Sequence, residues 1–379
     1  MANTYRLHLA VLVPYARRFA KGHPMKTLAK TPVTIVTGFL GSGKTTLLRH
    51  MLDNAQGRRI AVIVNEFGEL GIDGEILKQC SIGCTEEEAN GRVYELANGC
   101  LCCTVQEEFF PVMRELVARR GDIDHILIET SGLALPKPLV QAFQWPEIRS
   151  ACTVDAVITV VDSPAVARGT FAAFPDKVDA QRKLDPNLDH ESPLHELFAD
   201  QLASADLVIL NKADLINPED LAKVRAEVAE ELPPAVKIIE ASSGRLPLDV
   251  LLGLGAGSED HIDSRHSHHD HHHEDDDHDD HDHDAFDSIS IELPQAEERL
   301  LLDALTELVI KHEILRVKGF AAIPGKPMRL LIQGVGTRFD KHFDRAWGSD
   351  EARTTKLVLI GQELDAALLE STLRKALGA

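Results

Sequence analysis

The chain is poor in cysteine, poor in basic residues and without a long apolar run. It has six cysteines in 379 residues, too few for a disulfide-dense secreted scaffold. Its 60 acidic and 40 basic residues give a formal net charge of −20, which would repel the phosphate backbone of a nucleic acid. No apolar run approaches the roughly 18 residues that a membrane span needs. We therefore expect a cytoplasmic protein with reduced thiols, and neither nucleic acid nor a membrane among its partners.

The chain is long enough for two domains. Residues 1–30 combine basic residues with a short apolar run that Pro14 interrupts, so we expect a flexible extension there rather than a signal peptide. From residue 31 to 258, short Val- and Ile-rich runs alternate with helical patterns. This alternation predicts a mostly parallel sheet with helices on both faces, whose ligands bind at the carboxyl ends of the strands. The predicted strands begin at Val33, Ile60, His125, Ala156, Leu207 and Val236.

A histidine-rich segment separates the two predicted domains. Residues 261–284 hold ten histidines, ten acidic residues and one basic residue, Arg265. Such a composition cannot form an apolar core, so we predict a disordered linker over residues 259–285. Residues 286–379 then predict a smaller α+β domain with its helices on one face. Its predicted strands are 286–293, 314–323, 329–336 and 356–361, and its predicted helices are 296–312 and 363–377.

Gly38–Thr46 matches the phosphate-binding pattern G-x-x-x-x-G-K-[ST]. A predicted strand precedes the pattern and a predicted helix, "KTTLLRHMLDNAQG", follows it, as in a P-loop. Backbone N–H groups in such a loop point at phosphate oxygens, Lys44 reaches the β- and γ-phosphates, and the Thr45 hydroxyl binds Mg²⁺. The nucleotide-binding residues predicted here are Gly38, Gly41, Ser42, Gly43, Lys44, Thr45 and Thr46.

Two acidic loops complete the predicted phosphate end of the site. Glu129 ends a strand and is followed by Gly132, where GTPases usually have Asp-x-x-Gly. We expect Glu129 to hold Mg²⁺ and Gly132 to approach the γ-phosphate. Glu66 follows another strand and is either a ligand for water or metal, or a solvated loop carboxylate. The predicted catalytic residues are Lys44, Glu66 and Glu129.

The motif Asn211-Lys212-Ala213-Asp214 selects the base. The Asp214 carboxylate can accept hydrogen bonds from the two donors on guanine, and adenine has no matching pair. Asn211 would support the loop, the Lys212 stem would cover the base, and Ser242 would contact it from a later loop. We therefore predict GTP rather than ATP. No arginine finger is recognisable, so hydrolysis of GTP to GDP and phosphate should be slow in the isolated protein.

Three of the six cysteines, Cys100, Cys102 and Cys103, lie within four positions. A capping box from Thr104 to Glu107 predicts that a helix starts directly after them. A helix N-terminus lowers thiol pKa values and so favours the thiolate form that binds metals. Two or three thiolates without a fourth ligand form an open site, suited to a metal that must leave. Structural cysteines, a redox pair, and a static zinc site completed by Cys80, Cys84 or a histidine remain alternatives.

These motifs together resemble the CobW family of P-loop GTPase metallochaperones. The likeness includes "GFLGSGKTTLL", "NEFG", "NGCLCC", "ETSGLA", "NKAD" and "RVKGF", in that order, and covers the chain from Pro32 to its end. It implies a P-loop GTPase-like α/β domain with a smaller α+β C-terminal domain, and Cys100, Cys102 and Cys103 as the ligands of a transferred metal. Residues 134–163 and 176–202 look like the members implicated in cobalamin biosynthesis.

The resemblance implies GTP-dependent delivery of a divalent metal, with GTP and Mg²⁺ as cofactors. Co²⁺ delivered to the cobaltochelatase is the first expectation, and a zinc-allocating GTPase of the same family is the alternative. Two other hypotheses are an assembly or signalling GTPase with structural cysteines, and a metal store built on the histidine tract. We assign that tract a buffering or recruitment role, against the alternative of a solvated acidic linker.

Overall fold

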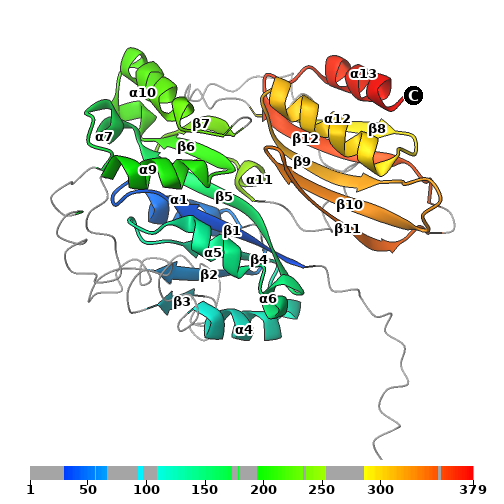
Figure 1. Ribbon diagram of the computed structural model, residues 1–379, viewed down its shortest axis with the longest axis horizontal. Coiled ribbons are helices and arrows are strands. Elements are labelled where there is room, and N and C mark those ends of the chain that lie inside the picture. The colour runs from blue at the N-terminus through cyan, green and yellow to red at the C-terminus, as the bar shows by residue number, and fades with distance from the viewer. Residues whose placement is uncertain are drawn as a thin grey trace, which may run out of the picture.

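The structure is a computed structural model. It describes residues 30–55, 57–65, 93–96, 109–172, 178, 194–233, 236–252, 286–348 and 351–378. The predictions for the N-terminal extension before Lys30, for Glu66, for the three clustered cysteines and for the histidine-rich linker lie outside these residues. Within the described residues, the chain forms two sheets with helices packed on them (Figure 1).

The first sheet has seven described strands in the order β3-β2-β4-β1-β5-β6-β7, and every neighbouring pair is parallel. The strands are β1 (Thr31–Thr37), β2 (Ile60–Asn65), β3 (Val93–Leu96), β4 (His125–Glu129), β5 (Cys152–Asp162), β6 (Leu207–Asn211) and β7 (Lys237–Ala241). β1 is buried along its whole length and lies in the middle of the sheet. The predicted α/β class is confirmed, and β3 is an edge strand that the sequence analysis missed.

Helices cover both faces of this sheet, as the strand pattern predicted. One face packs on α1 (Lys44–Asp53) and α11 (Leu248–Leu251). The helices on the opposite face are α4 (Phe110–Ala118), α5 (Pro136–Ala142), α6 (Pro146–Arg149), α7 (Ser163–Ala167), α9 (Leu194–Ala203) and α10 (Pro218–Glu230). The prediction that α1 extends to Gly57 was wrong. α1 ends at Asp53 because the Asn54 side chain donates to the carbonyl of His50, closing the last turn.

β5 contains a bulge at Asp155. Val33 of β1 pairs with Val154, but the next residue, Thr34, pairs with Ala156. Asp155 is therefore the extra residue, and a bulge re-aims the side chain that it carries. The Asp155 carboxylate accepts a long hydrogen bond, 3.4 Å, from the Thr34 hydroxyl, which in turn lies 2.8 Å from Nε2 of the buried His125.

The second domain is built on an antiparallel sheet in the order β11-β10-β9-β12-β8. Its strands are β8 (Phe286–Leu293), β9 (Ile314–Ala321), β10 (Met328–Val335), β11 (Arg338–Ala346) and β12 (Thr355–Gln362). Its helices, α12 (Glu298–Lys311) and α13 (Ala366–Leu377), share one apolar core with one face of the sheet, which confirms the expected one-sided α+β arrangement. The sequence analysis missed β11, in which polar residues predominate.

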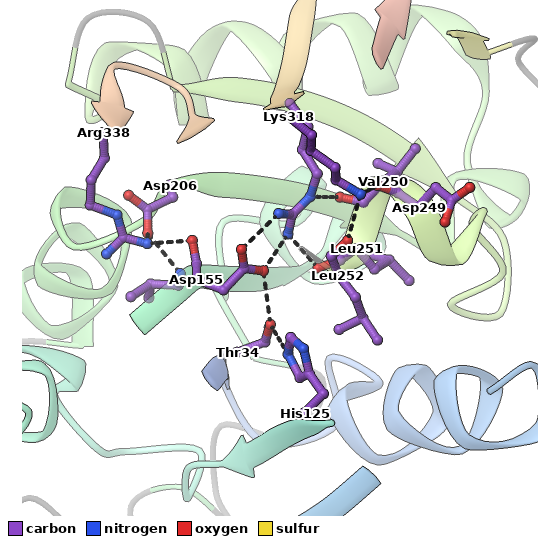
Figure 2. Close-up of polar contacts among 12 residues, drawn as sticks. Thr34, His125, Asp155, Asp206, Asp249, Val250, Leu251, Leu252, Lys318 and Arg338 are labelled. Atoms are coloured by element: carbon purple, nitrogen blue, oxygen red, sulfur yellow. Dashed lines mark hydrogen bonds and ion pairs between the residues drawn. The ribbon is translucent and has the colours of Figure 1, made fainter. Parts of the chain in front are cut away.

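The other face of this second sheet packs on the first domain. Leu315, Val335 and Ile360 belong to the same buried cluster as the residues of α1 and α11. The Arg316 guanidinium donates to both carboxylate oxygens of Asp155, at 3.1 and 3.0 Å, and to two backbone carbonyls of α11. Figure 2 labels three of the residues at this domain contact, Asp155, Val250 and Leu251. The bulged carboxylate of β5 is thus the docking point for β9.

A second cation of the C-terminal domain, Arg338 of β11, contacts the same region. Its Nη2 atom donates to the backbone oxygen of Asp155 and lies 2.7 Å from the Asp206 carboxylate (Figure 2). Burial raises the pKa of Asp206, and the charge of Arg338 partly opposes that rise. The second domain therefore contacts the amino-terminal half of β5. The predicted motifs lie at the opposite, carboxyl edge of the parallel sheet. No helix in the described part of the chain is both long and apolar enough to cross a membrane.

Candidate functional site

The glycines of the P-loop occupy positions that a larger residue would not fit. Gly38 and Gly43 have φ values of 136° and 102°, in the region that favours glycine. A Cβ on Gly38 would lie 2.1 Å from the carbonyl oxygen of Val160, and one on Gly43 would lie 2.3 Å from Nδ2 of Asn211. The loop therefore runs directly against the ends of β5 and β6, and only a glycine backbone allows that approach.

Lys44, the first residue of α1, is folded back over this loop. Its side chain is buried, and Nζ donates to the carbonyls of Gly38 at 2.9 Å and of Phe39 at 3.3 Å. The neighbouring Ser42 hydroxyl is also buried and has no hydrogen-bond partner among the described residues. A glycine cradle at a helix N-terminus, with a buried ammonium and a buried hydroxyl, fits a phosphate group.

Thr45 and Glu129 meet at the same edge of the sheet. Glu129 ends β4 and pairs in register with Val36 near the end of β1. The Thr45 hydroxyl donates to Glu129 Oε1 at 2.8 Å. A hydroxyl oxygen and a carboxylate oxygen are metal ligands of the kind that Mg²⁺ prefers. The two residues predicted to hold Mg²⁺, which lie 84 positions apart in the chain, are thus brought together.

The loop after β4 is held by Gln201, a residue that the sequence analysis missed. Gln201 lies in α9 and is fully buried, and Nε2 donates at 3.2 Å to the carbonyls of Gly132 and Ala134. A Cβ on Gly132 would lie 2.6 Å from the backbone nitrogen of Leu40. The Glu129–Gly132 loop is therefore packed tightly against the P-loop. A glutamine in the middle of a helix carries no motif that would have revealed this contact.

Asn211, the last residue of β6, links two loops of the site. Its Nδ2 donates to the carbonyl of Ser42 at 2.8 Å, and its Oδ1 accepts from the backbone N–H of Gly244 at 2.9 Å. The amide therefore joins the P-loop to the loop after β7, which contains Ser242. Asp214 and Ser242, the residues predicted to contact guanine, are both solvent-exposed, and each follows the end of its strand.

Lys212 has a second role in the structure. Its ammonium donates to the carbonyl of Gly41 at 2.7 Å and to Oδ2 of Asp162 at 2.6 Å. Asp162 ends β5 and was not among the predicted site residues. The only sequence signal for it is its position, as an acidic residue at the end of a buried strand, like Glu129.

The metal half of the prediction lies mostly outside the described residues. Among the residues that the structure does describe, no group of three or more His, Cys, Asp or Glu side chains could hold a metal ion. The ends of the adjoining strands are described, however. Because β3 is parallel to β2, Leu96 lies at the same edge of the sheet as Asn65 and Glu129. The chain therefore leaves β3 at the nucleotide edge, four positions before Cys100.

Cys152, a cysteine outside the predicted cluster, is described and has a different environment. It lies at the amino end of β5 and is buried. Burial raises the pKa of its thiol to about 11. The thiol is therefore neutral near pH 7 and is not in the form that binds metals.

Comparison with known proteins gives a consistent result. Residues 32–240 match the family described as "CobW/HypB/UreG, nucleotide-binding domain", and residues 286–377 match "Cobalamin synthesis protein cobW C-terminal domain". A Pseudomonas aeruginosa protein named "Zinc chaperone CobW" is 79% identical over 364 residues, covering 96% of each chain. A Sinorhizobium protein of the same name is 53% identical over 347 residues, covering 91% of this chain and 96% of the relative.

A more distant relative spans both domains as well. The Escherichia coli protein named "Zinc chaperone YjiA" is 30% identical over 342 residues, covering 88% of this chain and 94% of its own length. The residues that match the nucleotide-binding family, 32–240, include both the P-loop between β1 and α1 and the Asn-Lys-x-Asp motif at the end of β6. The chain therefore belongs to the CobW/HypB/UreG family and is a P-loop GTPase of the CobW type.

Proposed function

We propose that the protein is a GTP-dependent chaperone for a divalent metal, which binds at Cys100, Cys102 and Cys103 and is released after GTP hydrolysis. Zn²⁺ is the first candidate metal, because the relative that shares 79% identity over 96% of both chains is named a zinc chaperone. The structural observation that carries the proposal is the position of β3, whose end delivers the chain to the nucleotide edge four residues before Cys100.

In the proposed GTP site, each of the predicted residues that the structure describes has a role. Lys44 and the P-loop N–H groups hold the phosphates, Thr45 and Glu129 hold Mg²⁺, and Asp214 recognises guanine. Mg²⁺ at this position neutralises charge on the β- and γ-phosphate oxygens when it is bound. The hydrogen bond between Thr45 and Glu129 supports this assignment, since it preorganises both oxygen ligands beside the P-loop.

The proposed metal site is coupled to the nucleotide site through the chain segments that follow β2 and β3. Residues 66–92 leave β2 and residues 97–108 leave β3 at the edge where Glu129 lies, so a γ-phosphate that orders this edge also changes the surroundings of the thiols. GTP then raises metal affinity, and by linkage the metal raises GTP affinity by the same factor. A coupling of about 3 kcal/mol, the upper end of the usual range, corresponds to a roughly 150-fold change in the metal dissociation constant.

Co²⁺ supplied to a cobaltochelatase is the second candidate function. The observation that favours it is the match of residues 286–377 to a domain described as "Cobalamin synthesis protein cobW C-terminal domain". Thiolate sites bind Zn²⁺ more tightly than Co²⁺ in the usual order of stability. Delivery of cobalt would therefore depend on metal availability or on the client enzyme, rather than on the affinity of the cysteines.

A competition titration tests the cysteine site and its coupling to the nucleotide, which both candidates share. Zn²⁺ and Co²⁺ are titrated into the full chain with Mg-GTP, with Mg-GDP and without nucleotide, and bound Co²⁺ is followed by its thiolate charge-transfer and tetrahedral d–d absorption. We expect tight binding only with GTP, with Zn²⁺ displacing Co²⁺. Cys100→Ala and Cys102→Ala should abolish the absorption while GTP still binds, and Cys152→Ala, the matched control, should leave it unchanged. Equal metal affinity in all three nucleotide states would contradict the coupling.

Deleting residues 261–284 separates delivery from storage. The deletion removes ten histidines, so the total number of weakly bound ions should fall. The tight, nucleotide-dependent site should remain, because we place it on the three cysteines. Loss of that tight site on deletion would favour a metal store built on the histidine tract.

A further inference from the structure

Strand register places an acidic side chain directly beside the base-recognition motif. In the parallel pair β5 and β6, Asp162 is the partner of Asn211, and both are the last residues of their strands. The Asp162 side chain is only 2% exposed. Its Oδ1 accepts from the backbone N–H of Ala165 at 3.0 Å, and its Oδ2 accepts from the Lys212 ammonium at 2.6 Å. A buried carboxylate of this kind requires a charged partner, and Lys212 supplies it.

The backbone of Lys212 is in a conformation that its type rarely adopts. Its φ value is 60°, in the left-handed region, which costs a residue other than glycine roughly 1–2 kcal/mol. Two bonds from its ammonium, to Gly41 in the P-loop and to Asp162, hold the side chain across the loop. Asp214 follows two residues later in the same short turn. The direction of that turn is therefore set by the conformation of Lys212.

We propose that Asp162 is a positioning residue for guanine recognition. The carboxylate anchors the Lys212 ammonium, the anchored side chain stabilises the left-handed turn, and the turn presents Asp214 to the base. The anchored carbon stem of Lys212, whose side chain is 28% exposed, provides the wall that covers the base. This inference rests on the proposed binding of GTP at this site, and it adds a residue outside the P-loop and the Asn-Lys-x-Asp motif.

A purely structural role for Asp162 predicts something different. Asp162 also caps α7, a helix of five residues, by accepting from Ala165. Asp162→Asn separates the two roles, because the amide oxygen can still accept from Ala165 but the charge that pairs with Lys212 is lost. If capping were the whole role, Asp162→Asn would behave like the protein itself in nucleotide selectivity.

Equilibrium competition against a fluorescent guanine nucleotide gives dissociation constants for GTP and ATP, and thermal melting checks the fold. We expect Asp162→Asn to weaken GTP binding roughly tenfold, the effect of one charge-assisted hydrogen bond. ATP binding should change less, because adenine loses the cover of the Lys212 stem but has no hydrogen bonds to Asp214 to lose, so the selectivity for GTP should fall. Asp365→Asn is the matched control, since Asp365 caps α13 through the N–H of Leu368 at the same 3.0 Å.

A double-mutant cycle with Lys212→Met identifies the path of the effect. In the Lys212→Met protein, adding Asp162→Asn should cause no further loss of selectivity, because both changes remove the same contact. If Asp162→Asn does not fold, Asp162→Glu keeps the charge, displaces the carboxylate by one methylene and should still lower selectivity. Unchanged selectivity in a folded Asp162 variant would overturn the inference, whereas failure of the unmodified protein to prefer GTP would overturn the proposed function itself.

Discussion

Strand β5 buries a carboxylate near each of its ends, and the two pairs differ in their surroundings. Asp155, on the amino-terminal half, pairs with Arg316 of the other domain, and the two side chains are 3% and 2% exposed. Asp162, at the carboxyl end, pairs with Lys212, which directly follows the neighbouring strand β6 and has a side chain that is 28% exposed. One strand therefore serves two purposes. Its first half is closed by the second domain, and its last residue borders an edge that is open to a ligand.

The difference in solvent exposure between the two ion pairs indicates how each affects the stability of the protein. A fully buried ion pair adds little net stability over an apolar pair, but the removal of one partner leaves an uncompensated charge. Arg316 also donates to two carbonyls of α11, so it fixes how the second domain docks. The partly exposed Lys212 loses less when its partner is removed, because water can solvate its ammonium. We therefore expect changes at Asp155 to affect folding, and changes at Asp162 to affect nucleotide selectivity.

Arg316→Ala should have the largest effect on stability. The substitution leaves Asp155 buried without its guanidinium and removes the donors to α11, so we expect the free energy of unfolding to fall by about 3–5 kcal/mol. Urea denaturation measures this loss. Adding Asp155→Asn should recover part of it, since the buried charge is then gone. Arg299→Ala is the control, because Arg299 is 85% exposed and its helix pair with Asp303 contributes about 0.5 kcal/mol or less. A loss below 1 kcal/mol for Arg316→Ala would contradict the assignment.

Gly43→Ala should weaken GTP binding while affecting the domain contact little. A Cβ on Gly43 would lie 2.3 Å from Nδ2 of Asn211, so the amide that joins the P-loop to the loop after β7 must move. We expect at least a roughly tenfold rise in the GTP dissociation constant, since a hydrogen bond of this kind contributes about 1 kcal/mol and the strain adds to it. Gly57→Ala is the control. Gly57 also has a positive φ, 80°, but its Cβ would have no atom of the described chain within 4 Å. Equal GTP affinity in both variants would show that Asn211 tolerates the shift.

The pH dependence of stability should distinguish Asp206, at the domain contact, from Glu351, within the second domain. The pKa of Asp206 is raised mainly by burial, so the folded protein binds this proton more readily than the unfolded chain. Stability from this group is therefore lost as pH rises from its ordinary pKa of 3.8 through the raised value. Asp206→Asn should remove this dependence of stability on pH. The check is the urea midpoint, measured from about pH 3 to about pH 7, a range that begins just below the ordinary carboxyl pKa. An unchanged slope would contradict the role of Asp206.

Glu351 provides the comparison of opposite sign within the second domain. Hydrogen bonds from Arg345 lower the pKa of Glu351 to about 2. The stability from this group is present above the ordinary pKa of 4.5 and is lost as pH falls from there towards 2. Glu351→Gln should therefore destabilise the protein above pH 4.5, and the difference from the unmodified protein should shrink in acid. A difference that persists at pH 2 would show that the contact does not depend on charge.

Cys152→Ala should have the smallest effect. Cys152 lies at the amino end of β5, three residues before Asp155, and its neutral thiol packs in an apolar cluster. We expect a loss of about 1 kcal/mol in the free energy of unfolding and no change in metal affinity. The Cys152 thiol should also react slowly with iodoacetamide in the folded protein and rapidly in urea, as mass spectrometry of the digested protein would show. Fast labelling without urea would contradict its burial.

The sequence predicted the parallel sheet and the position of its motifs because those signals are local. Buried parallel strands such as β2 and β6 are nearly continuous runs of Val, Ile, Leu and Ala, and the P-loop glycines follow β1 in a fixed pattern. β3 has four residues, VYEL, and β11 carries charges on both faces, so neither shows the apolar pattern of a strand. The functional roles of Glu129, Asp214 and the three cysteines stay predictions.

The contacts that the sequence did not reveal are pairings between distant positions. Arg316 and Asp155 lie 161 positions apart, and Gln201 lies 69 positions from Gly132. No sequence pattern around Arg316 or Gln201 indicates that the side chain is buried. The partner of each side chain is determined by how the sheets and helices pack. Asp162 required the β5–β6 register, which places it opposite Asn211. Such residues become recognisable only when the strand order is known.

The bulge at Asp155 also sets the phase of β5. Before it, Cys152 and Val154 face the cluster that packs on α4, α5 and α6, and after it, Ala156 and Ile158 face the cluster that packs on α1. Even-numbered residues thus change faces at one position, which a regular strand with a period of two cannot do. The extra residue therefore holds both halves of β5 in register with β1, although the odd–even pattern changes at residue 155. Deleting residue 155 would place Ala156 directly after Val154 in a regular strand whose two halves keep their faces. The loss would be that of the carboxylate to which Arg316 donates.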